Sequence, residues 1–230
     1  MKMSLDLDDQ GFIVTGPASP LGRMLAETAS RRGARVINCL LPGETQPDGN
    51  ARLSYLTAEL SREEEADRLF ETASARITGL RVVMSTFSIR EVDTACSLAD
   101  MPLASWNGTV IAELRAAFLI SQRAVQEFLS SKQGGRILFL VQDENPAAPG
   151  HAIHFTLQNA LCALCRSLAK EYGRREIASN VVLIPEGGTM DSITLTRAVE
   201  TILFLASPEA SFVNGEVIPL AGAQAITKGT

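Results

Sequence analysis

The chain has 230 residues, of which 46% are hydrophobic, and carries a formal net charge of −5 with a pI near 5.2. This length suffices for one sizeable core. Because no run of about five like charges occurs, neither nucleic acid nor an anionic membrane is an expected partner. The acidic start MKMSLDLDDQ does not resemble a signal peptide, and the apolar runs are too short to span a bilayer, so we expect a cytoplasmic protein.

Short runs rich in Val and Ile alternate along the chain with longer stretches of helical spacing. The predicted strands are 12–15, 35–40, 53–56, 81–84, 136–141, 180–184 and 216–220. The predicted helices are 21–32, 62–77, 103–131, 153–172 and 195–206. This alternation predicts an α/β fold, doubly wound, with a parallel sheet of about seven strands and helices on both faces. Its ligand crevice should lie at the carboxyl ends of the strands.

Three glycines and one serine mark expected helix boundaries. Gly33, Gly79 and Gly173 fall where predicted helices should stop. Ser61 is expected to cap the helix that follows it, with Glu64 three residues later completing a capping box. Since no linker or repeat divides the sequence, we expect a single domain covering 1–230.

Cys162 and Cys165 form a CxxC pattern, which is typical of redox and zinc sites. Here the pattern lies in an apolar helical run, ALCALCRSL, and the sequence has no second CxxC or histidine pair to complete a zinc site. We therefore expect both cysteines to be small packing residues, and we expect no metal site.

The first predicted strand is followed by a glycine-containing loop and a helix, in the stretch FIVTGPASPLG. Such a loop can present backbone amides to a pyrophosphate at a helix N-terminus, and Gly16 and Gly22 are suitably placed. Pro20 lies between them, with Pro17 nearby, and proline has no N–H to donate. The loop alone is therefore weak evidence for a nucleotide.

The whole chain resembles the short-chain dehydrogenases/reductases (SDRs). TGPASPLG is similar to the TGxxxGxG loop of that family, with the middle glycine replaced by Pro20. GGRILFLVQ resembles the fifth strand, NVVLIPEG the sixth strand with its Pro-Gly, and AVETILFLASPEASFVNGEVIPLAGA the last helix and strand. The resemblance implies a Rossmann-like fold.

The catalytic positions of the family carry other residues in this chain. SDRs use a tyrosine as general acid/base and a lysine four residues later, and these positions fall on Phe155 and Asn159. The position of the substrate-orienting serine falls on Gln142, and that of the proton-relay asparagine falls on Glu113. Because phenylalanine has no titratable proton, the resemblance implies that this route of acid–base catalysis is lost.

The cofactor positions differ as well. The acidic residue that anchors the adenosine ribose in NAD enzymes falls on Leu40, and no arginine stands beside it to favour a 2′-phosphate. The Asn-Asn-Ala-Gly of the family reads as residues 85–88, in which Phe87 adds bulk. Glu59 alone matches the aspartate that contacts adenine. We therefore expect no NAD(P) on this chain and only a remnant loop at Gly16, Pro20 and Gly22.

Two further features point to assembly. After Pro185, where SDRs carry a long substrate lid, the chain passes almost directly into the next helix. In SDRs the helices matching 103–131 and 153–172 form a four-helix bundle with a twofold mate, and the segment matching 198–223 forms a second interface. Both helices keep apolar stripes, and small residues are expected on their outer faces: Ala116, Ala117, Ala160 and Ala163.

Three hypotheses follow. The leading one is a non-catalytic subunit that pairs with an active SDR paralogue, which would carry the NAD(P). The second is a ligand sensor that uses the old crevice. The third is a dehydrogenase with relocated chemistry, for which His151 or His154 beside Phe155 would be the base and Glu113 a buried carboxylate. Against the third, we expect histidines near PAAPG to be solvent-exposed.

Overall fold

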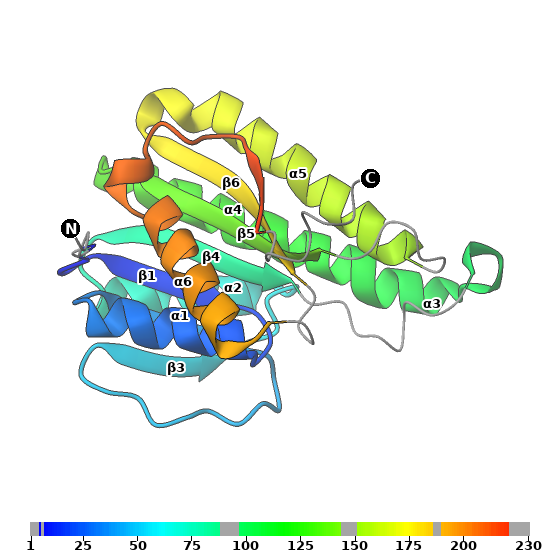
Figure 1. Cartoon of the computed structure of the whole chain (residues 1–230), viewed down its shortest axis with the longest axis horizontal. Helices are drawn as coiled ribbons and strands as arrows, with labels where there is room; N and C mark the ends of the chain where they lie inside the picture. The colour runs from blue at the N-terminus through cyan, green and yellow to red at the C-terminus, as the bar shows by residue number, and fades with distance from the viewer. Residues whose placement is uncertain (1–4, 6, 88–96, 144–150, 186–189, 221–230) are drawn as a thin grey trace.

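The computed structural model describes residues 5, 7–87, 97–143, 151–185 and 190–220. Seven parallel strands form one sheet in the order β3-β2-β1-β4-β5-β6-β7 (Figure 1). The strands are β1 Gly11–Thr15, β2 Arg35–Leu40, β3 Leu53–Thr57, β4 Leu80–Phe87, β5 Gly135–Asp143, β6 Ile177–Pro185 and β7 Val217–Pro219. The helices are α1 Pro20–Arg31, α2 Glu63–Arg76, α3 Leu103–Trp106, α4 Ala112–Ser131, α5 Ala152–Tyr172 and α6 Ser192–Ala206. The predicted α/β class, the parallel sheet and each predicted strand are confirmed.

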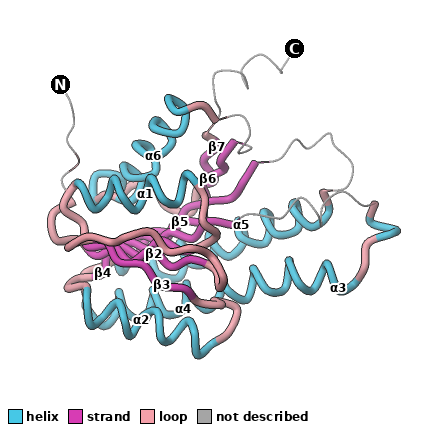
Figure 2. Tube along the Cα trace, turned by 90° about the horizontal axis from the view of Figure 1, so that it is seen from below, coloured by secondary structure: helices cyan, strands magenta, loops and turns pink. Residues whose placement is uncertain are grey.

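Helices cover both faces of the sheet, as predicted. Figure 2 shows α1 and α6 on one side, and α2, α4 and α5 on the other. Each side has its own buried cluster: α1 and α6 pack on Val14, Val82 and Leu138, and the other three helices pack on Ile13, Val83 and Phe139. Alternate residues of one strand thus serve opposite faces, which explains why the strands read as continuous apolar runs.

Helix α1 begins and ends at residues suited to its termini. Ser19 is its N-cap and Pro20 is the first helical residue, where a missing N–H costs nothing. The chain leaves the helix through Gly33, which has a φ of 95°. Gly173 also follows a helix but has a φ of −56°, so its role is not to supply a left-handed turn. Gly79 lies beyond the end of α2 at Arg76.

The predicted capping box at the start of α2 is wrong. Arg62 is the N-cap and makes no side-chain capping hydrogen bond. The Ser61 hydroxyl instead donates to the Glu59 carboxylate, at 2.8 Å. Glu63, Glu64 and Glu65 lie in the first turn, where their charge favours the positive end of the helix dipole without a cap.

The long predicted helix 103–131 is divided. A π-helical turn, Asn107–Ile111, lies between α3 and α4. Ala117, expected on an outer face, is fully buried and packs in the core, whereas Ala163 on α5 is exposed as expected. Phe118 and Leu129 point outward and are 53% and 38% exposed.

Cys162 and Cys165 are both buried in α5 and free, which confirms their packing role. The Cys165 thiol donates to the Ser179 carbonyl at 3.1 Å. Burial raises the pKa of Cys165 to about 11, so at neutral pH it stays a protonated thiol and a poor nucleophile. No group of metal-ligating side chains occurs within the described residues. Nor does any helix described here have the length and apolar character needed to cross a membrane.

Phe128 on α4 tests the core. Its ring packs over Gly135 at the start of β5, where an added Cβ would approach the ring to 2.4 Å. Phe128→Ala is expected to lower the free energy of unfolding by about 3–5 kcal/mol, because it leaves a cavity between helix and sheet. Phe212, 80% exposed, is the control, and Phe212→Ala should change it by less than about 0.5 kcal/mol. Equal effects in urea denaturation would contradict this packing.

Candidate functional site

The candidate site lies at the carboxyl ends of β1, β2 and β4. The strand order reverses between β1 and β4, since β1 pairs with β2 on one side and with β4 on the other. In open parallel sheets this reversal opens the crevice in which ligands bind. The loop from Gly16 to Gly22 crosses it, as predicted from the sequence.

The start of this loop is fixed to β4 by hydroxyl groups. Thr86 Oγ1 donates to the Thr15 carbonyl at 2.7 Å, and Thr15 Oγ1 donates to Ser85 Oγ at 3.1 Å. Gly16 has a φ of 123°, and a Cβ there would lie 2.2 Å from Thr86 Oγ1. Glycine is therefore required at this position, as the resemblance to the dinucleotide loop implied.

Two amides in the middle and at the end of the loop already have side-chain partners within the chain. Ser19 Oγ accepts the N–H of Gly22 at 3.1 Å, and Pro20 has none to donate. The N–H of Ala18 is bound by the carboxylate of Glu44, whose Oε1 lies 2.9 Å away. An internal carboxylate thus takes an N–H in the place where a nucleotide-binding loop would offer its amides to a phosphate oxygen.

Glu44 is held there by a tight turn directly after β2. Its own N–H donates to the Leu41 carbonyl at 3.2 Å, and its Oε2 accepts the Leu41 N–H at 2.8 Å. Pro42 and Gly43 occupy the central positions, and Gly43 has a φ of 85°, which matches a type II turn. Our sequence reading missed Glu44, although Pro-Gly after a strand is the signal of such a turn.

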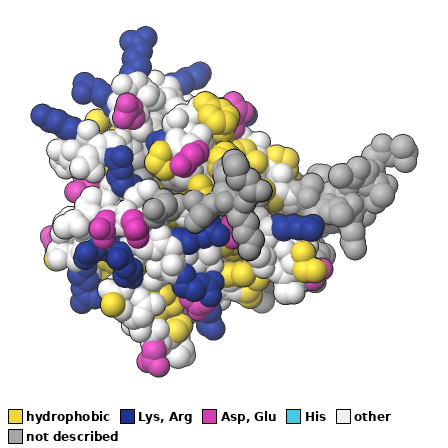
Figure 3. All heavy atoms as spheres, turned by 60° about the vertical axis from the view of Figure 1, so that its left-hand side comes forward, with side chains coloured by type: hydrophobic (Ala, Val, Ile, Leu, Met, Phe, Trp, Pro, Cys, Tyr) yellow, Lys and Arg dark blue, Asp and Glu magenta, His cyan; other side chains and the backbone are white. Residues whose placement is uncertain are grey.

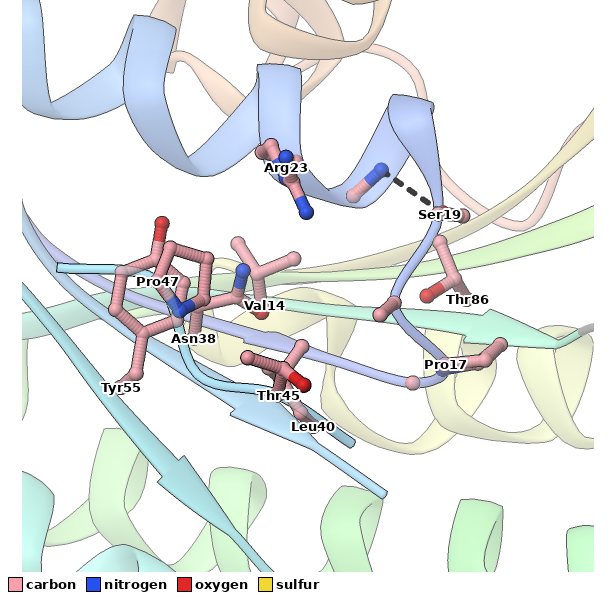
Figure 4. A pocket seen from close by; sticks show the side chains of 13 residues that line it. Val14, Pro17, Ser19, Arg23, Asn38, Leu40, Thr45, Pro47, Tyr55 and Thr86 are labelled. Atoms are coloured by element: carbon pink, nitrogen blue, oxygen red, sulfur yellow. Dashed lines mark hydrogen bonds between the residues drawn. The ribbon is translucent and has the colours of Figure 1, made fainter. Parts of the chain in front are cut away.

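The segment after β2 also fills the space beside the loop. Thr45 and Pro47 lie against Leu40 and Tyr55, and the cavity that remains is about 10 Å³ (Figure 4). This is room for about one water molecule. The residues as arranged therefore do not fit the adenosine half of a dinucleotide.

One expectation about charge is corrected. No arginine adjoins Leu40 in the sequence, but Arg23 reaches from α1 to line the same cavity (Figure 4). Leu40 is 4% exposed at the end of β2 and offers no group to a ribose hydroxyl. Glu59, the expected adenine contact, accepts a hydrogen bond from Ser61 and does not line this cavity.

A second cavity of about 160 Å³ lies beyond the loop, toward β5 and β6. Pro20, Phe87 and Gln142 line it, so the structure brings these three sequence-predicted positions together. Most of the remaining walls are aliphatic. The space is smaller than the ~300–1,000 Å³ of usual small-molecule pockets. Ser88 and residues 186–189, parts of two further motifs, lie outside the described residues.

The remaining family positions lie on α4 and α5. Phe155 is half-buried, and its ring meets those of His151 and His154 edge-on, with centroids 6.3 and 5.6 Å apart. Asn159 is exposed, and its amide donates to the Phe155 carbonyl one turn earlier, at 2.7 Å. Glu113 is half-buried in the first turn of α4.

The expected exposure of the two histidines is wrong. His154 lies in the first turn of α5 and is 1% exposed. His151, the N-cap residue of α5, is half-buried. The apolar residues next to His154, including Ile153 and Leu157, face the same core. Neither histidine lines the two cavities described above.

The family model described as enoyl-(acyl carrier protein) reductase matches residues 16–190, which include the loop, most residues that line the two cavities, and all of α5. The chain belongs to the short-chain dehydrogenase/reductase family. SDRs are NAD(P)-dependent oxidoreductases, and this chain has their Rossmann-like fold.

Similar proteins include the hydroxyacyl-CoA dehydrogenase ChsB1 of Mycobacterium tuberculosis, 25% identical over 95% of this chain and 79% of that protein. The 3-oxoacyl-[acyl-carrier-protein] reductase FabG of Escherichia coli is 24% identical over 91% of this chain and 95% of its own length. A short-chain dehydrogenase from Leptospira borgpetersenii with bound NAD⁺ shares the SDR fold, with a TM-score of 0.82 at 17% identity, covering 96% and 95% of the two chains.

Replacing Glu44 tests whether its carboxylate holds the loop. Glu44→Ala removes the acceptor for the N–H groups of Ala18 and Leu41. The free energy of unfolding is expected to fall by about 1–2 kcal/mol, because hydrogen bonds to a charged group are lost at a half-exposed site. Glu71→Ala, at an exposed position on α2, is the matched control and should change it by less than about 0.5 kcal/mol. A Glu44 variant as stable as this control in denaturant titrations would contradict the assignment.

Proposed function

We propose that this chain is a non-catalytic SDR subunit that supports an active SDR paralogue in a hetero-oligomer. The carrying observation is the internal occupation of the cofactor loop: the Glu44 carboxylate takes the Ala18 amide, and the adjoining cavity is about 10 Å³. In this proposal the chain binds no NAD(P), and the partner carries it. Phe155 and Asn159 at the tyrosine and lysine positions support the absence of catalysis.

The short connection after β6 supports the same proposal. Only residues 186–191 separate Pro185 from Ser192, the first residue of α6. A connection this short cannot supply the lid that in SDRs closes over the substrate and excludes water. The chain's contribution to chemistry would then be to brace the active partner and complete its pocket.

The outer face of α4 supports a partner at the helical bundle. Phe118 and Leu129 are exposed large apolar residues about three helical turns apart on α4, and the exposed Ile111 precedes them by about two turns, at the end of the π-helical turn, so the three share one side. On α5 the half-buried Ala160 and the exposed Ala163 leave room for a close helix approach. An active SDR paralogue has matching helices and is the occupant we propose for 103–131 and 153–172. The segment 198–223, of which 221–223 lies outside the described residues, would serve the second interface.

The class of substrate is a further part of the proposal. ChsB1 is named a hydroxyacyl-CoA dehydrogenase and FabG a 3-oxoacyl-[acyl-carrier-protein] reductase. The losses in this chain resemble those of the inactive subunit of the hydroxybenzylsuccinyl-CoA dehydrogenase of anaerobic toluene degradation. We propose that the complex acts on a hydroxyacyl thioester such as a hydroxyacyl-CoA.

The cavity of about 160 Å³ between the loop and β6 favours one alternative, a sensor of a small apolar ligand. A dehydrogenase with relocated chemistry is the third candidate. The burial of His154 in α5, away from either cavity, argues against it.

Calorimetric titration of the purified chain with NAD(H) and NADP(H) separates these functions. We expect no saturable binding and no turnover by the chain alone, and a single complex when it is co-expressed with a neighbouring active SDR. Micromolar dinucleotide binding would refute the subunit proposal in favour of a working dehydrogenase. Binding of another small molecule, with no partner recovered, would favour the sensor.

Phe118 tests the proposed interface. Phe118→Glu should weaken association with the partner by about tenfold or more, because burying a Phe side chain contributes ~1.5–3 kcal/mol and ~1.4 kcal/mol is tenfold in affinity. Ser74→Glu adds the same charge at an exposed position on α2 and is the matched control, expected to leave affinity unchanged. Analytical ultracentrifugation of the co-expressed proteins measures both. If Phe118→Glu leaves the affinity for the partner unchanged, the partner does not bind at the outer face of α4.

A further inference from the structure

A cavity of about 340 Å³ lies at the end of the sheet opposite the crevice. It is lined by residues near the N-terminal ends of three strands, among them Arg81 on β4, Arg136 on β5 and Ile177 on β6. Its other wall comes from Ala206 at the end of α6 and Pro208 just after it. None of the catalytic or cofactor positions discussed above lines it, whereas Ala206, Pro208, Ser211 and Asn214 belong to the segment 198–223 proposed for the second interface.

Among the described residues, the hydrogen bonds of the two arginines in this cavity go to backbone carbonyl groups. Arg136 Nη1 donates to the carbonyls of Gly135 and Glu176 at 3.0 and 3.1 Å, and Arg81 Nη1 donates to that of Gly134 at 3.4 Å. Neither guanidinium forms a salt bridge with a described carboxylate. The Nε of Arg136 is buried without a hydrogen-bond partner in the described part of the chain. Because this Nε has almost no accessible surface, an oxyanion in the cavity would instead meet the guanidinium N–H groups of Arg81 and Arg136 that these backbone bonds do not use.

The charge around the cavity favours the same ligand. The pKa of Arg136 is lowered, first by burial and then by the positive charge of Arg81, while the carboxylate of Glu176 acts in the opposite direction. Glu176 is the acidic residue among the described lining residues, so two guanidinium charges face one carboxylate. Figure 3 brings this end of the sheet forward and shows Lys and Arg side chains there, with Asp and Glu side chains among them.

Uncharged donors complete the lining. Gln10, Gln133 and Ser211 lie on the cavity wall, and so does Asn214. Asn214 Oδ1 accepts the Ser179 N–H at 2.9 Å, which turns its amide nitrogen toward Gly173, another lining residue. A ligand in this space would meet N–H and O–H donors beside the guanidinium groups.

We propose that this cavity binds a phosphate group, either as inorganic phosphate or as part of a small phosphate monoester. A phosphate group carries about −1.5 to −2 charges at neutral pH. It therefore balances the charge of two guanidinium groups better than a ligand with one carboxylate would. The site does not depend on the absence of a cofactor from the crevice at the other end of the sheet.

Isothermal titration in phosphate-free chloride buffer tests this site, with inorganic phosphate and glycerol 3-phosphate as separate probes. The wild-type chain is expected to bind at least one of them saturably, and the tighter one identifies the source of the phosphate. Arg81→Gln and Arg136→Gln should each weaken binding by about tenfold or more, since each removes charge-assisted hydrogen bonds. Arg62→Gln, an exposed arginine outside the cavity, should leave affinity unchanged.

Two results would overturn the proposal: no binding of either probe by the wild-type chain at millimolar concentrations, or binding unaffected by both arginine variants. The partly buried Arg136 can contribute to folding, so circular dichroism must show that its variant is folded. Arg81, whose hydrogen bond to the Gly134 carbonyl is long at 3.4 Å, provides the second variant.

Discussion

The hydrogen bonds of one carboxylate, that of Glu44, hold together the two loops that border the crevice. Glu44 joins the loop after β1 to the turn after β2, through the amides of Ala18 and Leu41. In an open nucleotide site those two loops stand apart and a ligand lies between them. Here the chain supplies both the negative charge and the bulk, and Thr45 and Pro47 follow Glu44 into the same space.

The crevice is thus filled by the chain itself, whereas two other surfaces of the molecule are free to bind a partner or a ligand. At the carboxyl ends of the strands, the amides of Ala18 and Gly22 are hydrogen-bonded within the chain, and a cavity of only about 10 Å³ remains beside them. On the outer side of α4, Phe118 and Leu129 remain exposed to water. Burial of large apolar side chains is favourable, so this surface would gain from contact with a partner. At the opposite end of the sheet, Arg81 and Arg136 share a cavity with the single carboxylate of Glu176 and form no salt bridge within the described part of the chain. Under the subunit proposal, the chain therefore acts by binding a partner through its surface and not by binding a cofactor in its crevice.

The sequence predicted the sheet well because each buried strand is a short, continuous run of Val, Ile and Leu. It was less informative where side chains decide the structure. Ser61 and Glu64 have capping-box spacing, yet Ser61 bonds to Glu59 because the helix begins later. Ala117 was predicted on the outer face but is buried, because the helical spacing of apolar residues alone does not determine which side of α4 packs on the sheet.

The site shows the same division between local and distant information. Gly16, Pro20 and Leu40 were found from the sequence because they lie within short motifs. Glu44 and Arg23 were missed, since their roles depend on contacts between segments that only the fold brings together. The Pro42–Gly43 pair did predict a turn, but not which amide the next side chain would reach.

The most direct test of the central claim is to count the dinucleotides in the complex purified from its native source, against copies of this chain and of its partner. Occupation of the loop by Glu44 predicts NAD(P) in numbers that match the partner alone, with none assigned to this chain. One dinucleotide for every subunit, or a nucleotide bound to a homo-oligomer of this chain, would contradict it.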